Sequence, residues 1–360
     1  MITPAETEKR NALKLSKPYV YEKILKYKEK TEKCESIAII QLQYDYRCNF
    51  HCNHCSIEKF RHSTSLHLTI PDIKNLSKQA DNLGLAHFVI TGGEPLMFPD
   101  LDELVAAIDP QKFYISCDTN GWHLNAARAH HLKSIGIDKI QLSIDNFDPE
   151  THDVFRNKPG SHARAMAAVE NAIDANLALI IQTVVTKQRL YTTEFQKFLS
   201  YFTAKNVPVF VTYAKPVGAW EGKFDILVNK DDMEYMRYLE SKYNVFTHLT
   251  PSYELDLGCI AVKRMISITE QGHVLPCPYL HVSLGNILDE PLSTIIYRGL
   301  SIKYFEKHVS TCLVAEDRNF IKKYVTKTYG KPLPILHTEM FEPEDYIPCI
   351  QQDPKQTKNV

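Results

Sequence analysis

The chain has 360 residues, of which 44% are apolar and 24% are charged, and its formal net charge is -1. This is enough apolar sequence for one large domain and a smaller one. The balanced charge offers no electrostatic attraction to nucleic acid or an anionic membrane, so neither partner is expected. There is no signal pattern at the start and no apolar run of the roughly 18 residues that span a membrane. Together with nine cysteines, which suit a reducing compartment, this predicts a cytoplasmic protein.

Strand and helix patterns alternate along most of the chain. An amphipathic helix is predicted over 18–33, within an N-terminal extension of residues 1–36. Six apolar, β-rich runs follow, near residues 37–44, 86–91, 112–117, 139–144, 178–185 and 207–213. Helices fill the gaps, most clearly over 69–84 and 161–173. The predicted fold is α/β, a partial (β/α)6 barrel of the TIM type over 37–224, with its chemistry at the carboxyl ends of the strands.

A cysteine-rich loop follows the first predicted strand directly. Cys48, Cys52 and Cys55 can converge on one inorganic centre from this short loop. An iron-sulfur cube takes four thiolates, so a trio leaves one coordination position open for a substrate or cofactor. The alternatives are a zinc loop completed by His51 or His54, or three buried thiols.

The spacing of these three cysteines resembles the signature of the radical S-adenosylmethionine (radical SAM) superfamily. The resemblance implies a 4Fe-4S cluster whose fourth iron is chelated by S-adenosylmethionine. It also implies reductive cleavage to a 5′-deoxyadenosyl radical and an electron donor such as flavodoxin or ferredoxin. One departure is His54, because the residue before the last cysteine is usually aromatic in the family.

Two further turns agree with this resemblance. Gly92, Gly93, Glu94 and Pro95 follow the second strand, where residues without a Cβ allow close backbone approach and a carboxylate can meet an ammonium. Alone, they would form an ordinary strand-to-helix turn. They resemble the family motif that binds the methionine amino group. Asn120 lies in a turn similar to the family's Thr-Asn-Gly turn, although such turns are common.

Later strand ends add weaker candidates. Ser143 and Asp145 lie on the same side of the fourth strand and are predicted to reach ribose hydroxyls, unless Asp145 caps the helix that follows. The stretch 213–218 resembles the family strand whose backbone pairs with adenine. Cys117 ends the third strand and is a candidate hydrogen-atom donor, but a buried, inert thiol is the favoured interpretation.

Cysteines return in a second region, 225–325, after a linking helix over 225–243. Cys259 and Cys277, with Gly272 and the segment 284–287, resemble the opening of the auxiliary-cluster domains called SPASM and twitch. Only Cys312 and Cys349 follow, so the resemblance implies one auxiliary 4Fe-4S cluster, with Cys259, Cys277 and Cys312 as ligands. Cys349, in the tail 326–360, is either the fourth ligand or part of a closing strap. A structural zinc is the alternative.

The predicted function is hydrogen abstraction from a substrate, leading to oxidation or bond formation. A small-molecule substrate is favoured over a peptide, because the N-terminal extension is short for the peptide-binding module of peptide-modifying relatives. The alternatives are a redox-neutral epimerase or rearrangement enzyme, a peptide-modifying maturase, and a zinc-binding or redox-sensing protein that is not an enzyme.

Overall fold

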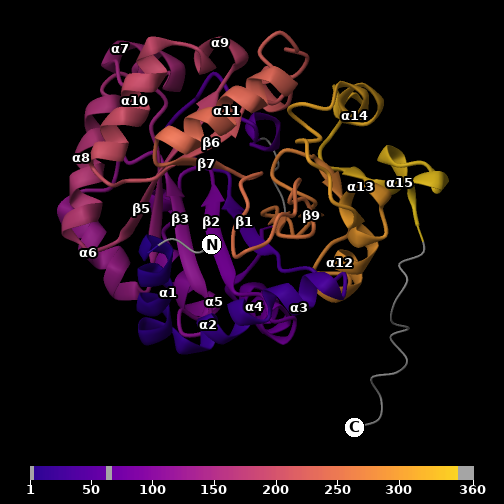
Figure 1. Cartoon of the computed structure of the whole chain (residues 1–360). Coiled ribbons are helices and arrows are strands. Elements are labelled where there is room, and N and C mark those ends of the chain that lie inside the picture. The colour runs from indigo at the N-terminus through magenta and orange to yellow at the C-terminus, as the bar shows by residue number, and fades with distance from the viewer. Residues whose placement is uncertain (1–3, 62–66, 348–360) are drawn as a thin grey trace.

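The computed structural model describes residues 4–61 and 67–347, and its centre is a nine-stranded sheet (Figure 1). The spatial order is β7-β6-β5-β4-β3-β2-β1-β8-β9, with all neighbours parallel except β8 and β9. The strands are β1 Ile39–Asp45, β2 His87–Gly92, β3 Tyr114–Thr119, β4 Lys139–Ser143, β5 Ala178–Val185, β6 Val209–Tyr213, β7 Val245–Thr247, β8 Met265–Ile268 and β9 Val274–Leu275. The six predicted strands and the partial barrel are confirmed.

Helices connect successive strands and cover the outer face of the sheet (Figure 1). They are α4 Ile70–Asn82, α5 Leu101–Ile108, α6 Ala126–Ile135, α7 Pro149–Arg156, α8 Ser161–Asp174, α9 Lys187–Leu190, α10 Thr193–Ala204 and α11 Lys230–Lys242. Helix α4 begins as its sequence predicts, because the Thr69 side chain accepts from the Asp72 amide while the Asp72 carboxylate accepts from the Thr69 amide. The two clearest predicted helices are therefore confirmed.

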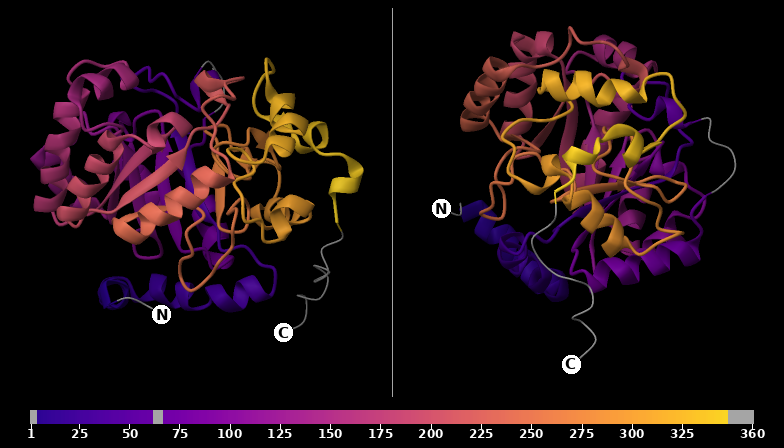
Figure 2. Two further views of the ribbon diagram at one scale, coloured as in Figure 1. Left: turned by 45° about the horizontal axis from the view of Figure 1, so that its top comes forward. Right: turned by 90° about the vertical axis from the view of Figure 1, so that its right-hand side faces the viewer.

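The N-terminal segment differs from its prediction. The expected single helix over 18–33 is two helices, α2 Pro18–Leu25 and α3 Tyr27–Glu32, preceded by α1 Pro4–Ser16. All three lie along the base of the barrel (Figure 2, left). Lysines of this segment are paired with carboxylates, since Lys23 is 6% exposed and its Nζ lies 2.7 Å from an oxygen of Asp81. These helices close the amino ends of the strands.

The C-terminal region shares the barrel's sheet and core. Strand β8 pairs with β1 in parallel and β9 continues the sheet, so the sheet crosses the domain boundary expected at residue 225. One hydrophobic cluster includes residues from both sides of that boundary, among them Ile40 and Ile266. The remaining elements are β10 Val282–Ser283, α12 Leu292–Leu300, α13 Lys303–Glu306, α14 Arg318–Lys323, β11 Ile335–Leu336 and α15 His337–Met340. They lie against one side of the barrel (Figure 2).

Across residues 4–61 and 67–347, no helix combines the length and the apolar composition needed to cross a membrane.

Because β8 continues the barrel sheet, damage to it should destabilise the whole molecule. Ile266 is fully buried on β8, so Ile266→Ala should cost about 2–5 kcal/mol of unfolding free energy. Denaturant unfolding followed by circular dichroism measures this as a shift of the main transition. Ile173→Ala is the matched control, because Ile173 is 41% exposed on α8. A separate transition, shifted alone by Ile266→Ala, would contradict the shared core.

Candidate active site

A cavity of about 180 Å³ lies where the carboxyl ends of the central strands meet the cysteine loop. Most of the predicted site residues line it: Cys48, Cys52, Cys55, Gly92, Gly93, Glu94, Asn120 and Ser143. They come from the loop after β1 and from the ends of β2, β3 and β4. Parallel strands bring these distant segments to one edge, as the sequence predicts.

The base of the cysteine loop is fixed by backbone contacts with the Gly92-Gly93 turn. The amide of Gly93 donates to the Asp45 carbonyl at 2.7 Å, and the amide of Glu94 donates to the Arg47 carbonyl at 2.8 Å. A Cβ at either glycine would overlap the Asp45 or Arg47 carbonyl oxygen. Gly92 also has a φ of +132°. Both glycines are therefore required by the close approach of the loop backbone.

The three thiols of the loop are half-buried and share the cavity wall. Burial raises the pKa of Cys48 to about 11 and also raises the pKa of Cys52 and Cys55. The positive charge of Arg61 opposes this shift at all three thiols. Thiolates in such a place need a cationic metal centre to stabilise them.

The histidines of the loop do not behave like metal ligands. The ring of His54 stacks on Phe155 with centroids 4.3 Å apart and an interplanar angle of 11°, and burial lowers its pKa to about 3. His54 therefore packs in the loop as an aromatic side chain would. His51 is exposed, with its Nδ1 3.3 Å from a guanidinium nitrogen of Arg61. In the described part of the chain, no three His, Cys, Asp or Glu side chains are placed to hold a single metal ion between them.

Glu94 is a buried carboxylate held by neutral donors. It is 1% exposed and accepts from the Thr119 hydroxyl at 2.6 Å, the Asn120 amide at 2.8 Å and the Leu96 amide at 3.1 Å. Burial raises the pKa of Glu94 to about 7 despite these hydrogen bonds. A cationic ligand such as an ammonium would strongly stabilise the ionised form of this buried carboxylate.

Ser143 and Asp145 are not equivalent. Ser143 lines the cavity, whereas Asp145 does not and is 3% exposed. The Asp145 carboxylate accepts from Arg156 Nε at 2.6 Å and from the Val184 amide at 2.9 Å. Burial raises the pKa of Asp145, but the positive charge of Arg156, together with smaller effects, outweighs burial and holds the pKa well below its usual range. The helix that follows is capped by Asp148. Neither sequence interpretation of Asp145 describes this ion pair.

Arg156 is a site residue that sequence reasoning missed. Its guanidinium lines the cavity, and its Nη1 lies 4.0 Å from Cys52 Sγ. A single arginine near the end of a helix matches no motif, so only the fold places it beside the cysteine loop. The sequence pattern predicts a helix after the fourth strand but assigns Arg156 no role.

Two other candidates lie away from the cavity surface. Cys117 is fully buried in the hydrophobic core and lines neither of the cavities described here, and burial raises the pKa of its thiol. Pro95 begins a short 3₁₀ turn, Pro95–Met97, in which the Leu96 amide donates to the Glu94 carboxylate. The proline thereby orients the turn that carries Glu94.

The second group of cysteines lines a larger cavity, of about 520 Å³, on the inner side of the barrel. Cys259, Cys277 and Cys312 share this wall, and Cys349 lies outside the described residues. Burial raises the pKa of Cys277 to about 12 and that of Cys312 to about 11, and the charge of Cys259 contributes to both shifts. These thiols too call for a metal centre before they can ionise.

In this region, the segment around Gly272 pairs with the segment 284–287. The amide of Val274 donates to the Gly285 carbonyl at 2.9 Å, and the amide of Ile287 donates to the Gly272 carbonyl at 3.0 Å. This pairing places Cys277 at the end of β9. The Cys259 amide donates to the Val309 carbonyl at 2.6 Å, which brings the segments of Cys259 and Cys312 together.

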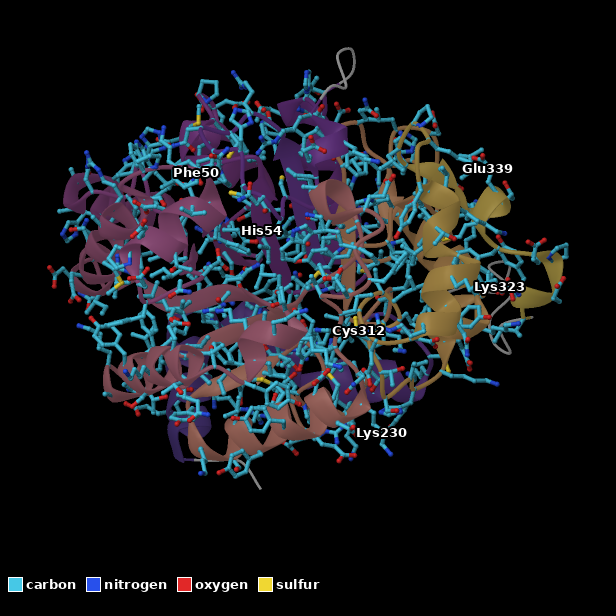
Figure 3. The ribbon with its side chains drawn as sticks, turned by 90° about the horizontal axis from the view of Figure 1, so that it is seen from above. Phe50, His54, Lys230, Cys312, Lys323 and Glu339 are labelled. Carbon is cyan, nitrogen blue, oxygen red and sulfur yellow. The ribbon has the colours of Figure 1, made fainter. Side chains whose placement is uncertain are left out.

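The two cavities share a wall inside the barrel. The side chains that line both are Gln41, Asp118, Gln182, Thr212, Lys215, Pro278 and Tyr279. Burial raises the pKa of Asp118 to about 6, opposed by side-chain hydrogen bonds that include one from Gln141. Figure 3, seen from above, labels His54 of the cysteine loop near the middle of the molecule and Cys312 towards the gold C-terminal helices. The interior thus separates two groups of three thiols.

Comparison with known proteins agrees with this architecture. The radical SAM superfamily profile matches residues 44–188. The AdoMet-dependent heme synthase of Methanosarcina barkeri (strain Fusaro / DSM 804) is 26% identical over 281 residues, 69% of this chain and 78% of that protein. The PqqA peptide cyclase of Rhizobium meliloti (strain 1021) is 32% identical over 270 residues, 71% of this chain and 72% of that protein.

Among solved structures, Streptococcus suis SuiB bound to the precursor peptide SuiA has a TM-score of 0.60 at 18% identity, covering 76% of this chain and 68% of that chain. This likeness concerns the fold. The chain belongs to the radical SAM superfamily. It is therefore an enzyme of a superfamily whose cofactors are a 4Fe-4S cluster and S-adenosylmethionine.

The raised pKa of Glu94 gives a pH test of the site. The amino group of S-adenosylmethionine donates a stronger hydrogen bond to the ionised carboxylate than to the protonated one, so affinity for S-adenosylmethionine should rise as the pH increases through about 7. Glu94→Gln should weaken binding by about 1–3 kcal/mol and remove this pH dependence. Calorimetry on the anaerobically reconstituted protein measures both effects.

The matched control is Glu103→Gln, an exposed residue on α5, which should bind like the unchanged protein. An unaltered dissociation constant in Glu94→Gln would remove Glu94 from the site.

Proposed function

We propose that this enzyme oxidises a substrate held between two iron-sulfur clusters, one bound by Cys48, Cys52 and Cys55 and one by Cys259, Cys277 and Cys312. The observation that carries the proposal is the shared wall of the two cavities, which lies between the two groups of thiols. Bound S-adenosylmethionine supplies the 5′-deoxyadenosyl radical that removes a hydrogen atom from the substrate.

The residues of the smaller cavity position S-adenosylmethionine. Glu94 accepts from its amino group, and the Arg156 guanidinium offers positive charge to its carboxylate. Asn120 and Ser143 supply polar contacts from neighbouring strand ends. The Gly92-Gly93 turn keeps Glu94 and the cysteine loop in fixed relation. His54, stacked on Phe155, excludes water from the inner side of the loop.

The larger cavity holds the substrate. After hydrogen abstraction, the substrate radical must lose one electron and one proton to give a two-electron oxidised product. A cluster held by Cys259, Cys277 and Cys312 would supply an acceptor for the electron, and Asp118 is suited to accept the proton, because its pKa is about 6 and it lines both cavities. A redox-neutral epimerisation needs a hydrogen donor at the substrate, and Cys117 lies in the core away from both cavities.

A small molecule is the favoured substrate, because the cavity between the two sites is internal and of a size that suits one. Modification of a peptide is the second candidate. It is favoured by the 32% identity to a protein named PqqA peptide cyclase. A peptide would have to place only the reacting side chain in the barrel, with its backbone at the rim.

Iron content tests the two-cluster assignment. Anaerobic reconstitution should give about seven to eight iron per chain, and replacing either cysteine trio by Ala should leave about four. Cys34→Ala is the matched control, because Cys34 is exposed and lies in neither group, so its iron content should not change. Zero iron after loss of one trio, or an unchanged content, would contradict the assignment.

Cleavage of S-adenosylmethionine tests the division of labour. With dithionite as reductant, protein lacking the trio Cys259, Cys277 and Cys312 should still form 5′-deoxyadenosine, because the first cavity is intact. Protein lacking Cys48, Cys52 and Cys55 should form none. Liquid chromatography with mass spectrometry measures the nucleoside. Loss of cleavage in a folded auxiliary-trio variant would contradict separate roles for the two groups.

A further inference from the structure

Lys215 is a buried ammonium between the two groups of cysteines. It follows β6 at the carboxyl end of the barrel, is 6% exposed and lines both cavities. Its Nζ donates to the Tyr213 carbonyl at 2.7 Å and lies 4.0 Å from the centroid of the Tyr279 ring. These contacts hold the charge in place but leave it without a full counter-charge.

The groups whose negative charge acts on Lys215, once they are thiolates, are the cysteines of the second group. Burial lowers the pKa of Lys215, and the charges of Cys312, Cys277 and Cys259, in that order, raise it. The influence is mutual, since Lys215 lowers the pKa of both Cys312 and Cys277. Within the described residues, no carboxylate forms an ion pair with Lys215.

A buried cation is expensive unless an anion compensates it. Four-iron clusters bound by thiolates are anionic, and their reduction potential depends on nearby charge and on solvent exposure. A fixed positive charge stabilises the reduced, more negative state more than the oxidised state. It therefore raises the potential and makes the cluster a better electron acceptor.

We propose that Lys215 is a positioning residue that supplies the counter-charge of the auxiliary cluster and raises its potential, so that the cluster can take the electron released by the substrate radical. This rests on the proposed function, which places a cluster at Cys259, Cys277 and Cys312. In the step, the substrate radical is oxidised by one electron, the cluster is reduced by one, and the proton passes to Asp118.

The test isolates the auxiliary cluster and needs no substrate. In protein that already carries Cys48→Ala, Cys52→Ala and Cys55→Ala, the auxiliary cluster is the one that remains, and a mediated redox titration followed by electron paramagnetic resonance gives its midpoint potential. Lys215→Met should lower that potential. Lys215→Arg keeps the charge, so its midpoint potential should stay close to that of the parent.

Lys139→Met is the control, because Lys139 lines the larger cavity from the first residue of β4. It should leave the potential close to that of the parent. Lys215→Met is not expected to unfold the chain, because it removes a buried charge that lacks a carboxylate partner, and circular dichroism checks this. Lys215→Gln, which keeps a polar group but no charge, should give the same lowered potential and serves if the Met variant misfolds.

The outcomes separate the two claims. A parent protein without iron would overturn the proposed second cluster, and the role of Lys215 with it. A parent with four iron and an unchanged potential in Lys215→Met and Lys215→Gln would overturn the role of Lys215 alone. An equal shift in Lys139→Met would show a general charge effect and would also overturn it.

Discussion

The close backbone contact between the cysteine loop and the Gly92-Gly93 turn is the constraint on which the site depends. Two amide-to-carbonyl hydrogen bonds join the turn to Asp45 and Arg47, in a space that admits no Cβ. This contact sets the distance between the three thiols and Glu94. The same turn places Glu94 under the end of β3, where Thr119 and Asn120 hold its carboxylate. A cluster and a cofactor amino group can therefore meet in one fixed geometry.

Burial then determines the chemistry of both halves of the interior. It raises the pKa of Cys48, Cys277, Glu94 and Asp118, so each of these groups is costly to ionise until a cationic partner or a metal centre arrives. Lys215 and Arg156 are the opposite case, since they carry positive charge into the same space. Apart from the ion pair of Arg156 with Asp145, these interior groups lack a full charge partner, and the proposed cofactors would supply one.

Much of this architecture could be predicted from the sequence, because short-range patterns record it. The six strands, the helix start at Thr69 and the grouping of the cysteines follow from periodicity, capping and spacing. Contacts between residues far apart in the chain have no such local pattern in the sequence. Nothing local shows that β8 pairs with β1, that Asp145 is used by Arg156, or that Lys215 faces the second group of thiols. The glycines were predicted for a ligand's approach, whereas the loop backbone requires them.

The central claim is that one substrate cavity lies between two clusters. Anomalous scattering at the iron edge, from crystals of the anaerobically reconstituted protein, tests it most directly. The account predicts two iron peaks, one beside Cys48, Cys52 and Cys55 and one beside Cys259, Cys277 and Cys312, with the larger cavity between them. A single peak at the cysteine loop, or a zinc signal at the second group, would contradict it.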